Sequence, residues 1–154
     1  MGRISHRSPL FREKALICQD LAIVLNDSRL TYCAKFAVID QAIWIWSEFD
    51  GKYEGCKLWS AKAMRGWKID RPLIHEHPVP RKEIRARLFS LRKATAASVR
   101  RVLNNLCFGV VVTRKEDVAL IKAGLNATMP ADWDGKDVFA RYKVVGIEVR
   151  RVAA

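Results

Sequence analysis

An apolar run that leads directly into a helix-start pattern constrains this chain more than any other feature. Residues 107–112 read Cys-Phe-Gly-Val-Val-Val, and a compact run rich in β-branched residues is typical of a buried strand. The next four residues, 113–116, read Thr-Arg-Lys-Glu, which is the pattern of a capping box at the start of a helix. Gly124 is well placed to end that helix. The sequence therefore predicts a buried strand followed at once by a helix.

A second extended segment carries two of the three histidines. Residues 74–79 read Ile-His-Glu-His-Pro-Val, and Pro78 and Pro80 disfavour helical geometry there. Alternation along a strand would put His75 and His77 on one face and Glu76 on the other. An imidazole beside a carboxylate can act as a general base or a metal ligand. The alternative is a polar strand end whose rings hydrogen-bond to nearby backbone.

The first part of the chain reads as helical, with helices expected over 11–25 and 29–49. Asp27 or Ser28 can cap the second of these helices, and its apolar residues recur every three or four positions. We expect this stripe to form the spine of the core. Its members are Tyr32, Phe36, Ile39, Ile43 and Trp46.

These patterns predict an α+β fold that is mostly helical, with strands near 74–79, 107–112 and 144–149. A length of 154 residues suits one domain. Its expected parts are a basic arm at 1–9, a helical half at 11–70, a strand-helix unit at 73–124, and a loop, short helix and strand at 125–154.

Charge indicates the class of partner. The chain has 28 Lys and Arg against 16 Asp and Glu, a formal net charge of +12. Such an excess favours a polyanionic partner, either nucleic acid, DNA or RNA, or an acidic protein surface. The excess is concentrated between positions 81 and 101, where Glu83 is the only acidic residue. The basic residues expected to contact phosphate there are Arg81, Lys82, Arg85, Arg87, Arg92, Lys93, Arg100 and Arg101.

The sequence has no apolar run of membrane-spanning length and no signal-peptide pattern, so we expect a soluble, cytoplasmic protein without a membrane partner. Its four cysteines are widely spaced and never form a Cys-x-x-Cys pair, which favours reduced cysteines. A structural zinc ion held by Cys56, His75, His77 and Cys107 is the disfavoured alternative.

Three pieces of the sequence together resemble the HNH (ββα-metal) nuclease motif. They are Glu76-His77-Pro78-Val79-Pro80, Asn104-Asn105-Leu106 and Val112-Thr113-Arg114-Lys115-Glu116-Asp117, and the resemblance covers residues 74–124. It implies that His77 is the general base that activates water and that Glu76 is a ligand of Mg²⁺ or Mn²⁺. Asn104 or Asn105 would orient the histidine.

The resemblance also implies a last metal ligand on the helix, at Asp117 or else Glu116. Asp117 stands where the family usually has His or Asn, although a carboxylate suits Mg²⁺. The segment between His77 and Thr113 is long and helical in pattern, where the family motif has a short loop.

The function expected from these features is nucleic-acid binding, with metal-dependent endonuclease activity on phosphodiester bonds if the HNH-like residues converge. The alternatives are a non-catalytic nucleic-acid-binding protein and a basic inhibitor or assembly protein that docks on an acidic partner. Convergence of Glu76, His77 and an acidic side chain of the 114–123 helix would favour the endonuclease.

Overall fold

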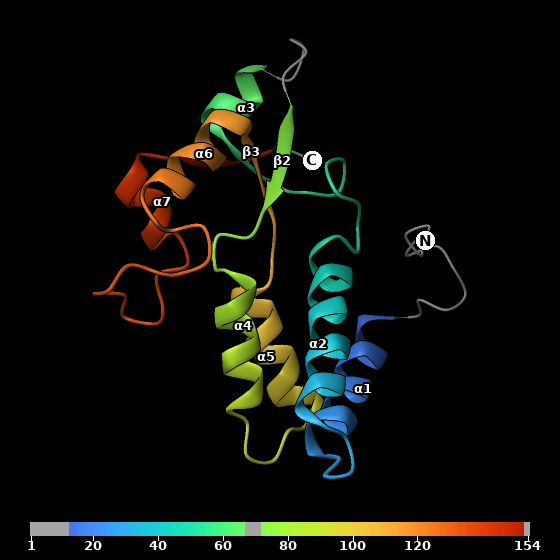
Figure 1. Ribbon diagram of the computed structural model, residues 1–154. Coiled ribbons are helices and arrows are strands. Elements are labelled where there is room, and N and C mark those ends of the chain that lie inside the picture. The colour runs from blue at the N-terminus through green and yellow to red at the C-terminus, as the bar shows by residue number, and fades with distance from the viewer. Residues whose placement is uncertain (1–12, 67–71, 153–154) are drawn as a thin grey trace.

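The structure is a computed structural model that describes residues 13–66 and 72–152. Within these residues seven helices accompany a four-stranded sheet, which confirms an α+β fold with mostly helical content (Figure 1). The basic arm expected at 1–9 lies outside the described residues.

Four helices form a layer below the sheet in Figure 1. They are α1 (Lys14–Asn26), α2 (Tyr32–Ser47), α4 (Arg81–Phe89) and α5 (Ala96–Leu106). Thr95 begins α5 with a capping box, as its hydroxyl accepts from the Ser98 amide at 3.1 Å. Asn26, at the end of α1, donates to and accepts from the backbone of Ala94, which ties α1 to the start of α5.

The apolar stripe of α2 is buried only along its second half. Ile39, Ile43 and Trp46 lie in the core with residues of α1, α4 and α5, as expected. Tyr32 is 68% exposed and Phe36 is 36% exposed, so the prediction that both belong to the core is wrong. Periodicity sets the face of a helix but not how far along its length a neighbour covers it.

The sheet has the strand order β2-β3-β1-β4. Its strands are β1 (Leu58–Ser60), β2 (Leu73–Glu76), β3 (Val110–Thr113) and β4 (Val149–Arg151). The valine-rich strand β3 is fully buried, pairing antiparallel with β2 and parallel with β1. Three further helices accompany the sheet: α3 (Ala61–Gly66), α6 (Arg114–Lys122) and α7 (Ala140–Val145).

Strand boundaries differ from those expected. A C-terminal strand is present as predicted, but it lies at Val149–Arg151 rather than at 144–149, because Val144 and Val145 end α7. Gly146 follows α7 at φ +71°, a left-handed conformation that suits glycine at a helix end. The extended segment predicted at 74–79 leaves the sheet after Glu76, and the one predicted at 107–112 pairs only from Val110.

The capping box at residue 113 is confirmed and does more than begin α6. The buried Glu116 carboxylate accepts from the Thr113 amide at 2.9 Å and from the Ser60 hydroxyl at 2.6 Å. Ser60 in turn accepts from the Ala63 amide at 3.0 Å and so caps α3. One carboxylate therefore joins the starts of two helices that are distant in sequence.

Strands β2 and β3 and helix α6 form an antiparallel strand pair followed directly by a helix. Helices α4 and α5 are inserted between the two strands and project away from the sheet as a hairpin (Figure 1). In the described part of the chain, no helix combines the length and apolarity needed to span a membrane.

Candidate functional site

The His-Glu-His segment divides its side chains between two sides of the sheet, as strand alternation requires. The rings of His75 and His77 lie together, with centroids 5.7 Å apart and planes at 88°. Glu76 points to the opposite side, where it meets α7. The histidines and the carboxylate that were expected to cooperate therefore have separate surroundings.

His77 is packed against the end of α2. Its Nε2 lies 2.9 Å from the Ser47 hydroxyl, and its ring meets the Trp44 indole edge-on at 5.2 Å. The Ser47 hydroxyl also lies 3.2 Å from the Trp44 carbonyl, and when it donates its one proton there, His77 Nε2 is the donor to Ser47. Burial, and then electrostatic interactions with His75, Arg81 and Arg141, lower the pKa of His77 to about 3. The imidazole is therefore neutral at physiological pH.

His75 fills the space between the sheet and the loop before β3. A Cβ placed on Gly109 would lie 1.8 Å from its Nε2, so the ring rests directly on the glycine backbone. Its Nδ1 lies 3.9 Å from a carboxylate oxygen of Glu48, just beyond the end of α2. Glycine at 109 is thus a packing requirement of His75.

Glu76 is bound by two residues of α7. Arg141, which is fully buried, forms an ion pair with the carboxylate, and the Tyr142 hydroxyl donates to it. Arg141 also donates to the carbonyl oxygens of Pro78 and Leu125 at 2.8 and 2.5 Å. Burial raises the pKa of Glu76, while Arg141 and the Tyr142 hydrogen bond act to lower it. This network holds α7 against the last residue of β2 and the residues that follow it.

The other residues that the HNH resemblance implies, Asp117 and Asn105, lie on different helices. Asp117 lies in the first turn of α6 and pairs with Arg114 at 3.5 Å. Its charge contributes to raising the pKa of Glu76. Asn105 is exposed on α5, and within the described residues no hydrogen bond joins it to His77.

No three His, Cys, Asp or Glu side chains within residues 13–66 and 72–152 are grouped so that they could hold a metal ion. Both oxygens of Glu76 accept hydrogen bonds from α7, so a metal ion bound there would share the carboxylate with Arg141 and Tyr142.

The cysteines of the zinc alternative are engaged with backbone. Cys56 Sγ lies 3.3 and 3.2 Å from the carbonyl oxygens of Leu58 and Gly109, and Cys107 Sγ lies 3.4 Å from that of Ile43. Burial raises the pKa of both thiols. Both thiols therefore stay protonated at neutral pH when no metal is bound.

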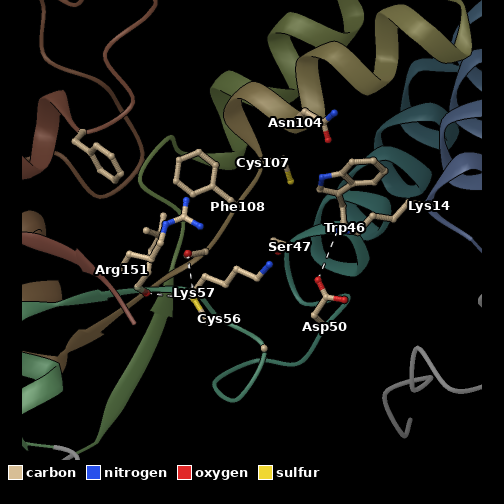
Figure 2. Close-up of a pocket in the computed structure, with 14 residues that line it drawn as sticks. Lys14, Trp46, Ser47, Asp50, Cys56, Lys57, Asn104, Cys107, Phe108 and Arg151 are labelled. Atoms are coloured by element: carbon tan, nitrogen blue, oxygen red, sulfur yellow. Dashed lines mark hydrogen bonds and ion pairs between the residues drawn. The ribbon is translucent and has the colours of Figure 1, made fainter. Parts of the chain in front are cut away.

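A cavity of about 500 Å³ opens between the helical layer and the sheet (Figure 2). Lys57 extends into it from the sheet side, and Lys14 and Asp50 face it from the helical side, 3.9 Å apart. Ser47 and Cys107 also line it. Because its lining contains charges of both signs and a protonated thiol, the cavity does not favour one class of ligand.

The eight basic residues of the 81–101 segment fall into two groups. Arg81 and Arg85 both bind Asp40 of α2, and their guanidinium groups lie over the rings of Trp44 and Phe36, at 4.7 and 4.5 Å. These two arginines are thus used within the fold. The remaining cations of the segment are exposed: Lys82, Arg87, Arg92, Lys93, Arg100 and Arg101.

Sequence reasoning missed the residues that organise this region, above all Asp40, Arg141 and Tyr142. The Arg-Tyr pair at 141–142 gives no local signal, because both residues bind Glu76, which lies 65 and 66 positions earlier in the chain.

Comparisons of the chain with protein-family models, curated proteins and solved structures give no match.

Proposed function

We propose that the protein binds nucleic acid by placing the α4–α5 hairpin, residues 81–106, against the phosphate backbone. One observation carries the proposal: six cations of the hairpin are exposed and form no ion pair with any acidic residue that the structure describes. The paired Arg81 and Arg85 are held on Asp40, which fixes α4 against α2.

Unpaired surface cations lower the free energy of a complex with nucleic acid mainly by releasing counterions from the phosphates. Contacts of this kind position a protein without reading bases. The cations lie on two helices and on the connection between them, so the expected contact follows a backbone rather than inserting one helix into a groove. The proposal covers DNA and RNA alike.

Endonuclease activity is the second candidate, and the observation in its favour is the β2-β3-α6 arrangement, an antiparallel strand pair followed by a helix. Binding without hydrolysis is favoured over it, because Arg141 and Tyr142 occupy the Glu76 carboxylate and because His77 faces Ser47. Cleavage by this region would require Glu76 to leave its buried cation, which is costly.

The binding test is fluorescence anisotropy with a labelled duplex DNA and a labelled RNA over a series of salt concentrations. We expect affinity to fall with salt, and we expect Lys82→Gln, Arg92→Gln and Lys93→Gln together to flatten this dependence. Each lost phosphate contact removes about 0.9 from the log–log slope for duplex DNA. The matched control, Lys62→Gln with Lys115→Gln and Lys122→Gln, removes three exposed charges from α3 and α6. An equal loss of slope in the control would refute the hairpin as the contact surface.

The cleavage test incubates the protein with plasmid DNA and structured RNA, with and without Mg²⁺ or Mn²⁺, beside His77→Ala. Metal-dependent cleavage that is lost in His77→Ala would establish the second candidate. Absence of any binding to either nucleic acid at low salt would refute the proposed function and direct the search to an acidic protein partner.

A further inference from the structure

A separate cavity of about 450 Å³ lies between α4, α5 and the loop that precedes α7. Three cations from three parts of the chain line it: Arg87 of α4, Arg101 of α5 and Lys136 of the loop. Asn105, one turn beyond Arg101, adds an amide, and no acidic side chain lines it within the described residues. The cavity is therefore positively charged.

The acidic residues of the adjoining loop already have partners within the loop and α7. The Asp134 carboxylate accepts from the backbone amides of Lys136 and Asp137, at 2.8 and 2.9 Å. The Asp137 carboxylate pairs with Lys143 at 2.7 Å. Asp134 also interacts electrostatically with Lys136 and so offsets part of that cation's charge, whereas neither carboxylate forms an ion pair with Arg87 or Arg101.

The loop is held so that Arg87 is in place before any ligand binds. The Arg87 guanidinium lies 6.0 Å from the centre of the Trp133 ring, and the Trp133 indole donates to the Asp137 carbonyl at 2.8 Å. Gly135 has φ +78°, and a Cβ there would lie 2.6 Å from Arg87 Nη2. Glycine at this position therefore permits both the turn and the close approach of the cation.

We propose that this cavity binds a phosphate monoester, and that within a bound nucleic acid it receives the terminal phosphate of a strand. A monoester carries a charge of about −1.5 to −2 at neutral pH, which three cations match better than they match the single charge of a backbone phosphodiester. Arginine is suited to its oxygens, since the guanidinium donates two parallel hydrogen bonds. The monoester site stands on the cavity alone, whereas the strand end as its source rests on the proposed function.

The first test titrates inorganic phosphate at constant ionic strength and follows the Trp133 indole resonance by ¹H–¹⁵N NMR, with the peak assigned through Trp133→Phe. We expect a saturable shift. Arg101→Gln and Lys136→Gln should each weaken phosphate binding about tenfold, the effect of losing one charge-assisted hydrogen bond. Lys115→Gln, the same charge change on α6, should leave it within about twofold. A shift that does not saturate, or equal effects in all three variants, would overturn the site.

A second variant tests the site without changing its charge. Gly135→Ala displaces the Arg87 guanidinium and strains the turn, so we expect it to weaken phosphate binding while the NMR spectrum of the sheet stays unchanged. Phosphate affinity equal to that of the original protein would show that Arg87 does not bind the anion, and the three-cation site would fall.

The source of the phosphate is tested with two oligonucleotides that differ only in a 5′-phosphate or 5′-hydroxyl end. Tighter binding of the phosphorylated strand, lost in Arg101→Gln and kept in Lys115→Gln, would support the strand end. Equal binding of both strands would overturn that part, while saturable binding of inorganic phosphate would still support the monoester site. If neither strand binds but inorganic phosphate does, the proposed function fails and the phosphate cavity stands.

Discussion

Lowering the pH from 7 to 5 should destabilise the protein through His77, and the structure sets the size of the effect. The pKa of His77 is about 3 in the folded protein, against an ordinary value of 6.5 that applies when the chain is unfolded. Between these values the unfolded chain binds a proton that the folded protein does not. Stability is therefore complete above pH 6.5 and falls as the pH falls toward 3. At pH 5 the loss from this one group should be about 2 kcal/mol relative to pH 7.

The assay is urea unfolding followed by tryptophan fluorescence at pH 7 and pH 5, for the original protein and for His77→Gln. Glutamine can still donate to the Ser47 hydroxyl but does not titrate, so its variant should lose about 2 kcal/mol less on acidification. Subtracting the two proteins removes the pH-dependent contributions that they share. A pH dependence that is the same in both proteins would refute the account of His77 as a buried, neutral imidazole.

Three further substitutions test the packing. Arg141→Met should cost about 3–5 kcal/mol in urea unfolding, because it leaves the Glu76 carboxylate buried without its cation, and a cost below about 1 kcal/mol would contradict the network. Gly109→Ala should cost about 1–3 kcal/mol by forcing the His75 ring from its place, and a stable variant with an unmoved His75 resonance would show otherwise. Phe36→Ala should cost less than the roughly 3–5 kcal/mol of a packed phenylalanine, because part of its ring already faces solvent.

Local signals predicted much of the fold. The capping box at Thr113 begins α6 where expected, because a cap depends on residues within four positions. The cap expected for α2 at Asp27 or Ser28 is wrong, because Thr31 caps that helix and Tyr32 begins it. Pro78 and Pro80 indicated that this segment is extended. Alternation along it correctly put His75 and His77 on one side and Glu76 on the other. The limits of these elements were less predictable, since pairing partners decide where a strand stops.

The candidate site depended on contacts that no local pattern contains. The position of Asp40 beside two arginines 41 and 45 residues away, and that of Glu76 beside Arg141, follow from how α2, α4, β2 and α7 pack. The same packing leaves Tyr32 exposed although its spacing matches the core stripe.

The sequence by itself determined the start of α6, the faces of the strands and the strong positive charge, because each depends on near neighbours or on composition alone. Only the tertiary structure decided which cations pair with acidic residues of the fold and which remain exposed to bind a partner. Arg85 is held on Asp40, whereas Arg87 and Arg101 meet Lys136 around a cavity. The physical reason is that a charge's role depends on its partners in space, and folding brings together partners that are far apart in the chain.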